Sequence, residues 1–156
     1  MYQVFRLALG GLIAVALQWF VFGRLRLWGA YPDVVLIWVA FQALRYGRTT
    51  GTVTGFATGF LMDAVYGTWG LEMILKTTVG FVVGFFRSEL GENLRVQPSQ
   101  AFLGALLVAV VHHGLRVIIL ALDLDTRTTF LITGLWFGSA LYTAFVAFVF
   151  ALFRQR

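Results

Sequence analysis

Six ionisable residues lie within or beside long apolar stretches of the chain: Asp63, Glu72, Lys76, His112, Arg116 and Asp123. A charge in the hydrocarbon of a membrane costs at least about 2.5 kcal/mol, so such groups pair with one another or line a wet cavity. Two interpretations follow from their chemistry. Either they form a structural network, in which Glu72 pairs with Lys76, or they line an outward-facing polar pocket that binds a ligand or a partner segment.

The histidines raise the question of a metal site or a proton relay. His112 and His113 are adjacent, and neighbouring residues of a helix point to different faces, so the two rings do not readily share one metal ion. His112, Arg116 and Asp123 lie close to one helix face. We expect Arg116 to pair with Asp123 or with Asp63. We expect no metal, no cofactor and no enzymatic activity, because the sequence has no credible nucleophile–base pair, phosphate loop or dinucleotide motif.

Two stretches repeat a small or ionisable residue at every fourth position, which places these residues on nearly one helix face. They are Gly51, Gly55, Gly59 and Asp63, and then Glu72, Lys76, Gly80 and Gly84. Small residues let helices approach closely in lipid. We expect the two helices to pack antiparallel, with Gly51 level with Gly84 and Asp63 level with Glu72. The alternative is that one glycine run is a docking face for another protein.

The composition is that of an integral membrane protein. Of 156 residues, 60% are hydrophobic and 12% are charged, and the mean hydropathy is +0.84. Soluble domains carry about 25% charged residues, so a chain this apolar could not cover its surface in water. Soluble enzymes, coiled coils and nucleic-acid-binding domains are thereby excluded. The chain has no cysteine, which excludes disulfides and thiolate metal sites.

Charge-poor runs predict six transmembrane helices, since about 20 residues cross a bilayer. The expected spans are residues 7–23, 32–46, 50–66, 71–86, 99–122 and 128–153. The first could be a signal peptide, but no cleavage-site pattern follows it, so we expect it to be retained. The second is short, and the chain has five spans if it does not cross. We therefore predict a single all-α transmembrane domain over residues 1–156, folded as a compact six-helix bundle.

The distribution of arginine predicts the orientation of these spans. Six spans put both termini on one side, together with Arg6, Arg45, Arg48, Arg87, Arg95, Arg154 and Arg156. The other side holds Arg24, Arg26 and Arg127. Basic residues concentrate on the cytoplasmic side, so we expect both termini in the cytoplasm. The ionisable residues within the spans then gather in the outer half of the membrane.

Residues 32–86 combine several specific features. Pro32 and Asp33 open a short apolar span, and a basic hairpin follows at residues 45–48. Residues 51–63 then read GTVTGFATGFLMD, before a small turn that contains glycine. In this motif and in its span layout, the chain resembles the MreD family of bacterial rod-shape-determining membrane proteins, whose members show a similar G-F-x-x-G-x-x-x-D run.

The resemblance implies a non-enzymatic, multi-pass scaffold in the bacterial cytoplasmic (inner) membrane, within the machinery that directs lateral peptidoglycan synthesis and cell shape. It implies MreC as the expected partner, in a wider complex with RodA, a class B penicillin-binding protein and MreB. Membrane lipids are further expected partners, and nucleic acid is not. The family is also distantly similar to the S-components of energy-coupling-factor transporters, which have six spans. That similarity implies the second hypothesis, a substrate-binding subunit of a small-molecule (vitamin) transporter.

Overall fold

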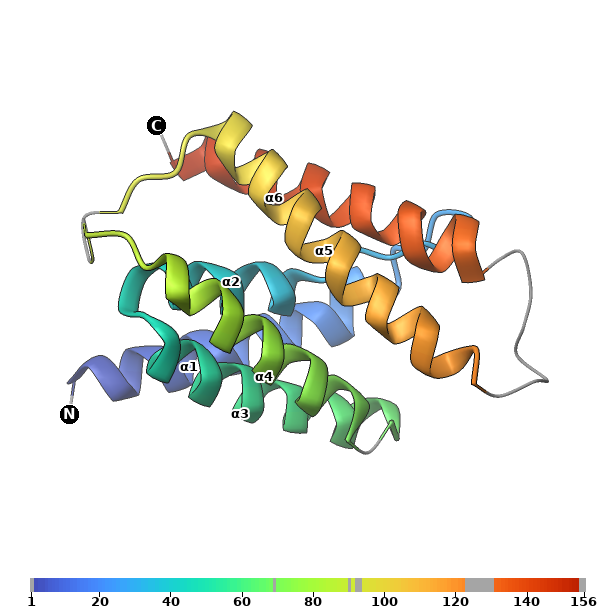
Figure 1. Ribbon diagram of the computed structural model, residues 1–156, viewed down its shortest axis with the longest axis horizontal. Coiled ribbons are helices and arrows are strands. Elements are labelled where there is room, and N and C mark those ends of the chain that lie inside the picture. The colour runs from blue at the N-terminus through green and yellow to red at the C-terminus, as the bar shows by residue number, and fades with distance from the viewer. Residues whose placement is uncertain (1, 69, 90, 92–93, 123–130, 155–156) are drawn as a thin grey trace. The chain divides into compact units, whose positions relative to one another are not determined.

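In the computed structural model, the residues described are 2–68, 70–89, 91, 94–122 and 131–154. They form six α-helices, and these ranges contain no β-strand. The chain divides into two compact units, each shown in Figure 1. The amino-terminal unit comprises Met1–Phe20 and Val34–Leu94, and the carboxy-terminal unit comprises Val21–Asp33 and Arg95–Arg156. The single domain expected from the sequence stays a prediction.

Four helices build the amino-terminal unit. They are α1 (Tyr2–Leu17), α2 (Val34–Tyr46), α3 (Arg48–Tyr66) and α4 (Leu71–Val83), and the 3-10 turn η2 (Gly84–Phe86) continues α4. A π-helical segment, η1 (Gln18–Phe22), continues α1. The core between α1, α2 and α3 consists of small and branched apolar side chains: Ala14, Val15, Val35, Val39 and Met62.

Two glycines permit the sharp turns of this unit. Gly47 alone separates α2 from α3, with φ of +88°, and Gly67 ends α3 with φ of +71°. Both lie in the left-handed region, where a side chain is strained and glycine is not. These turns let α2, α3 and α4 follow one another as adjacent helices, as Figure 1 shows for the antiparallel pair α3 and α4.

The carboxy-terminal unit pairs α5 (Pro98–Leu120) with the π-helical η5 (Leu131–Gly138) and α6 (Ser139–Arg154). Pro98 suits the first turn of α5, and Gln97 and Gln100 form a capping box there. The Trp136 indole N–H donates to the backbone oxygen of Val110 at 2.9 Å, which ties η5 to α5.

The helices follow the expected spans, with differences mainly at their ends. The first helix begins at Tyr2, before the expected start at residue 7. Three helical segments are long and apolar enough to cross a membrane: Tyr2–Phe22, Pro98–Leu120 and Ile132–Arg154. Val34–Tyr46 is apolar but shorter. Trp69, residues 123–125 and the start of the expected sixth span lie outside the described residues.

Large apolar side chains are exposed on five of the six described α-helices, and α2 is the exception. Examples are Leu12 on α1, Phe56 on α3, Ile74 on α4, Leu107 on α5 and Phe145 on α6, each more than 50% exposed. Soluble monomers rarely expose so much contiguous apolar surface. Threonine hydroxyls of α3 form hydrogen bonds with the backbone of their own helix. The Thr52 hydroxyl donates to the Arg48 carbonyl oxygen at 2.7 Å, and the Thr58 hydroxyl donates to the Thr54 carbonyl oxygen at 2.7 Å. The surface is therefore that of a membrane protein.

Candidate functional site

The α3 and α4 helices pack backbone against backbone along the two glycine runs. A Cβ atom added at Gly51 would collide with the carbonyl oxygen of Gly80, and one added at Gly55 would collide with that of Lys76. At Gly59 an added Cβ would lie 2.6 Å from Met73 Cα. Contacts under 3.0 Å cannot be accommodated without moving the backbone. The contacts favour internal packing over a docking role, because these glycines face α4.

The expected register of this pair was wrong by about one helical turn. Gly51 lies level with Gly80, whereas the residue spacing predicted a position level with Gly84. Gly84 instead lies against Arg48, at the start of α3. Spacing of four residues identifies the contacting face of a helix but fits several registers equally well. The turn between the helices selects among them, through Asp63.

Asp63 caps the amino terminus of α4 from the last turns of α3. Its Oδ1 accepts hydrogen bonds from the Glu72 N–H at 3.0 Å and the Thr68 hydroxyl at 2.8 Å. Its Oδ2 accepts from the N–H groups of Gly70 at 3.0 Å and Met73 at 2.9 Å. The first N–H groups of a helix have no partner within it, and negative charge is stabilised there. Asp63 is 1% exposed, so its charge is held entirely by this turn.

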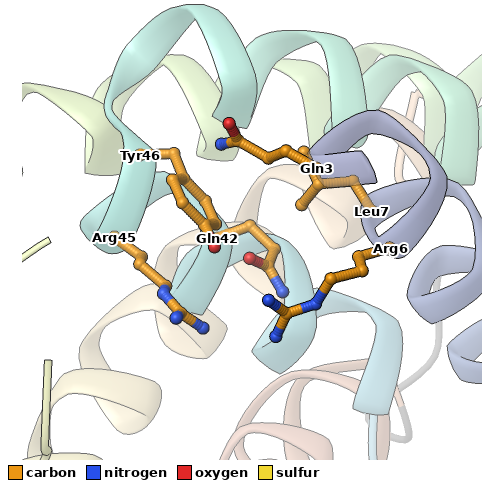
Figure 2. A pocket seen from close by; sticks show the side chains of 6 residues that line it. All are labelled: Gln3, Arg6, Leu7, Gln42, Arg45 and Tyr46. Carbon is orange, nitrogen blue, oxygen red and sulfur yellow. The ribbon is translucent and has the colours of Figure 1, made fainter. Parts of the chain in front are cut away.

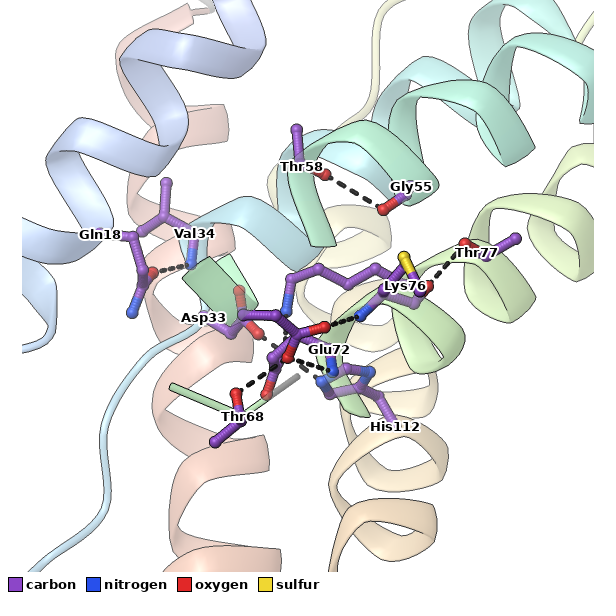
Figure 3. A network of polar contacts seen from close by, with 12 residues as sticks. Gln18, Asp33, Val34, Gly55, Thr58, Thr68, Glu72, Lys76, Thr77 and His112 are labelled. Carbon is purple, nitrogen blue, oxygen red and sulfur yellow. Dashed lines mark hydrogen bonds and ion pairs between the residues drawn. The ribbon is translucent and has the colours of Figure 1, made fainter. Parts of the chain in front are cut away.

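Glu72 and Lys76 form the ion pair that their spacing predicts. Lys76 Nζ lies 2.5 Å from Glu72 Oε2 along one face of α4, and both residues are buried (Figure 3). Removing charge from water is costly, and a close partner offsets the cost only while both members are present. Within the amino-terminal unit, the structure thus brings Asp63, Glu72 and Lys76 together at the junction of α3 and α4.

A second polar group lies in the carboxy-terminal unit, around His112 of α5. Asp33 Oδ2 lies 3.6 Å from His112 Nε2, and both side chains are buried. The backbone N–H of Asp33 donates to the Thr143 hydroxyl of α6 at 3.0 Å, which holds the aspartate between these two helices. A carboxylate this near an imidazole can pair with its protonated form or exchange a proton with it.

Tyr31 gathers the other polar side chains of α5. Its ring packs edge-on against His113 with centroids 6.1 Å apart, and Arg116 Cζ lies 5.7 Å from its centroid. Its backbone N–H donates to the Ser139 hydroxyl at 3.2 Å. Asp123 lies outside the described residues, so the expected pairing of Arg116 with Asp123 or Asp63 stays a prediction.

Sequence reasoning missed two buried polar residues. Gln18 is 1% exposed, and its Oε1 accepts a hydrogen bond from the Val34 N–H at 2.8 Å, which caps the start of α2. Its signal was a lone amide within an otherwise apolar run. Asp33 was interpreted only as a charge favoured at a helix start, because the sequence does not show that its carboxylate meets His112.

The helices, the exposed apolar side chains and the buried ion pair define an all-α membrane protein. The whole chain, residues 1–156, matches the family model of the rod shape-determining protein MreD. The chain therefore belongs to the MreD family, as its sequence motif predicted, and the family suggests a role in rod-shape determination. This is a family of shape-determining membrane proteins and is not a known enzyme family. Searches of curated proteins and of solved structures gave no match.

Proposed function

We propose that this chain is a multi-pass scaffold of the bacterial inner membrane that binds MreC and helps to organise lateral peptidoglycan synthesis. The match of the entire chain to the MreD family carries this proposal. RodA, a class B penicillin-binding protein and MreB complete the expected assembly. The exposed apolar surface of the helices supports it too, because a scaffold within the membrane must bind its partners through helix faces.

We place the MreC contact on the outward face of α3. The glycines of α3 are covered by α4, whereas Val53, Phe56 and Phe60 on another face are 62%, 52% and 47% exposed. Their spacing of three and four residues makes one continuous stripe along the helix. A single-span partner offers an apolar helix, and such helices associate in lipid by close packing of complementary faces.

Disulfide cross-linking tests this contact without background, because the chain has no cysteine. Phe56→Cys is expected to cross-link to single cysteines placed along the transmembrane helix of MreC in native membranes. Leu107→Cys is the matched control, since Leu107 is 70% exposed on α5. Cross-linking from Leu107 alone would contradict the proposed face. The absence of any cross-link, together with no co-purification of MreC, would contradict the docking role itself.

We further propose six membrane crossings with both termini in the cytoplasm. In the amino-terminal unit, Arg6 near the start of α1 and Arg45 near the end of α2 line one pocket, so they lie at one end of that unit. Arg48 begins α3 and lies against Gly84 at the far end of α4, so it extends the same basic end. Asp63 and Glu72 meet at the other end of the α3–α4 pair. This polarity is the one that the positive-inside rule gives to a membrane protein.

We do not extend the proposal to small-solute transport. Two of the three carboxylates expected to line a pocket are engaged by the chain itself: Asp63 by the α3–α4 turn and Glu72 by Lys76. The third, Asp123, lies outside the described residues. The similarity to transporter S-components stays a prediction from the family resemblance.

A further inference from the structure

A small pocket opens at the basic end of the amino-terminal unit, between the start of α1 and the end of α2. Its lining consists of Gln3, Arg6, Leu7, Gln42, Arg45 and Tyr46. The cavity volume is about 70 Å³. Figure 2 shows the guanidinium groups of Arg6 and Arg45 on either side of the Gln42 amide. Two cations and an amide from two helices therefore converge on one space.

The lining is positive, since it contains two arginines and no carboxylate among these described residues. The Arg45 guanidinium lies 5.0 Å from the Tyr46 ring centroid, a cation–π contact that holds it beside the pocket. Arg6 is held similarly, 5.6 Å from the ring of Tyr2. Gln42 Oε1 is buried and has no hydrogen-bond partner among the described residues. This oxygen is an acceptor, so the end of the amide that can serve an anion is the N–H2 group, a donor.

We propose that this pocket binds a phosphate group, presented by the headgroup of an anionic membrane lipid. The planar fork of each guanidinium matches the oxygens of a phosphate in two parallel hydrogen bonds. The Gln42 amide can donate a further hydrogen bond from between them. Basic pockets between helices on the cytoplasmic side of membrane proteins bind acidic headgroups by this chemistry.

The surroundings favour a lipid over free phosphate. Leu7 forms part of the lining, and the next turns of α1 expose Leu9, Leu12 and Ile13, which are 47–55% exposed. A bound headgroup would therefore have acyl chains continuing along an apolar helix surface. Topology alone explains an arginine at each helix end, but it does not require two of them to face one amide.

Thermal unfolding of the purified full chain in mild detergent tests the proposal, with added short-chain phosphatidylglycerol, phosphatidylcholine or inorganic phosphate. Saturating phosphatidylglycerol is expected to raise the Tm by about 5 °C, because a ligand stabilises the state that binds it. Phosphatidylcholine and inorganic phosphate at the same concentration should raise it far less. The test does not depend on MreC, so its failure leaves the proposed scaffold role standing.

Arg6→Gln should abolish the Tm shift, and so should Gln42→Glu, which keeps both arginines and adds a repelling carboxylate. The matched control is Arg87→Gln, because Arg87 is exposed beside Gly47 at the same basic end but outside the pocket. Equal shifts in Arg6→Gln, Gln42→Glu and Arg87→Gln would overturn the site. An equal effect of inorganic phosphate would overturn the assignment to a lipid. If Arg6→Gln does not fold, Gln42→Glu decides the question.

Discussion

Asp63 bonds to both helices that it joins. Its backbone oxygen accepts the N–H of Gly67 at 2.8 Å, which closes the end of α3, while its carboxylate accepts N–H groups at the start of α4. Without these bonds, the backbone groups at both helix ends would lack hydrogen-bond partners inside a membrane, where water is scarce. This accounts for a carboxylate at the end of a glycine run by structure alone.

Asp63→Asn is expected to destabilise the fold by about 3 kcal/mol, since charged hydrogen bonds are strong and an amide N–H2 would face backbone donors. Equilibrium unfolding in mixed detergent measures the loss. Glu89→Gln serves as a control, because Glu89 is exposed after the same helix pair. A variant with unchanged stability but a loss of rod shape in cells would instead give Asp63 a functional role.

The Glu72–Lys76 pair makes a different prediction, because its members depend on each other. Lys76→Met leaves a buried carboxylate without its lysine and is expected to cost about 3 kcal/mol. The double variant Glu72→Gln/Lys76→Met should lose less than the two single variants combined. Equilibrium unfolding of the two single variants and the double variant completes this double-mutant cycle. Strictly additive losses would show that the 2.5 Å contact carries no coupling energy.

The packing of α3 on α4 depends on glycine at defined positions, which substitution by alanine tests directly. Gly55→Ala places a methyl group against the Lys76 backbone, so we expect it to destabilise by at least about 2 kcal/mol. Gly104→Ala on α5 is the control, since a Cβ there meets nothing within 4 Å and alanine favours helix. Equal stability of the two variants would contradict the close packing described here.

The sequence predicted the helices better than their register. Apolar runs located α3 and α4 to within three residues, because burial in lipid and helical periodicity are both local properties. The register depends on how Asp63 meets the N–H groups of α4, a contact that spacing alone does not reveal. The contact of Asp33 with His112 was missed for the same reason: it joins residues about 80 positions apart, and no local pattern records it.

Exposed large apolar side chains occur on α1, α3, α4, α5 and α6, while arginines gather at one end of the amino-terminal unit. Together they favour crossing helices with a cytoplasmic basic end. α2 is the demanding case, because its 13 residues extend only about 20 Å. A thin bilayer, or shielding by neighbouring helices, would accommodate such a short span.

Cysteine labelling tests the six-span orientation and the crossing of α2 together. Trp28 is 96% exposed in the segment before α2, and Glu89 is exposed in the segment after η2. With both termini cytoplasmic and six spans, Trp28→Cys should react with a membrane-impermeant maleimide in intact cells of a host with accessible periplasm. Glu89→Cys should react only after permeabilisation. If α2 does not cross, the chain has five spans, and an odd number of spans cannot place both termini on the basic side. Labelling of both cysteines from outside, or of neither, would therefore contradict the topology. Labelling of Trp28→Cys but not of Glu89→Cys in intact cells would support it, because each position serves as the control for the other.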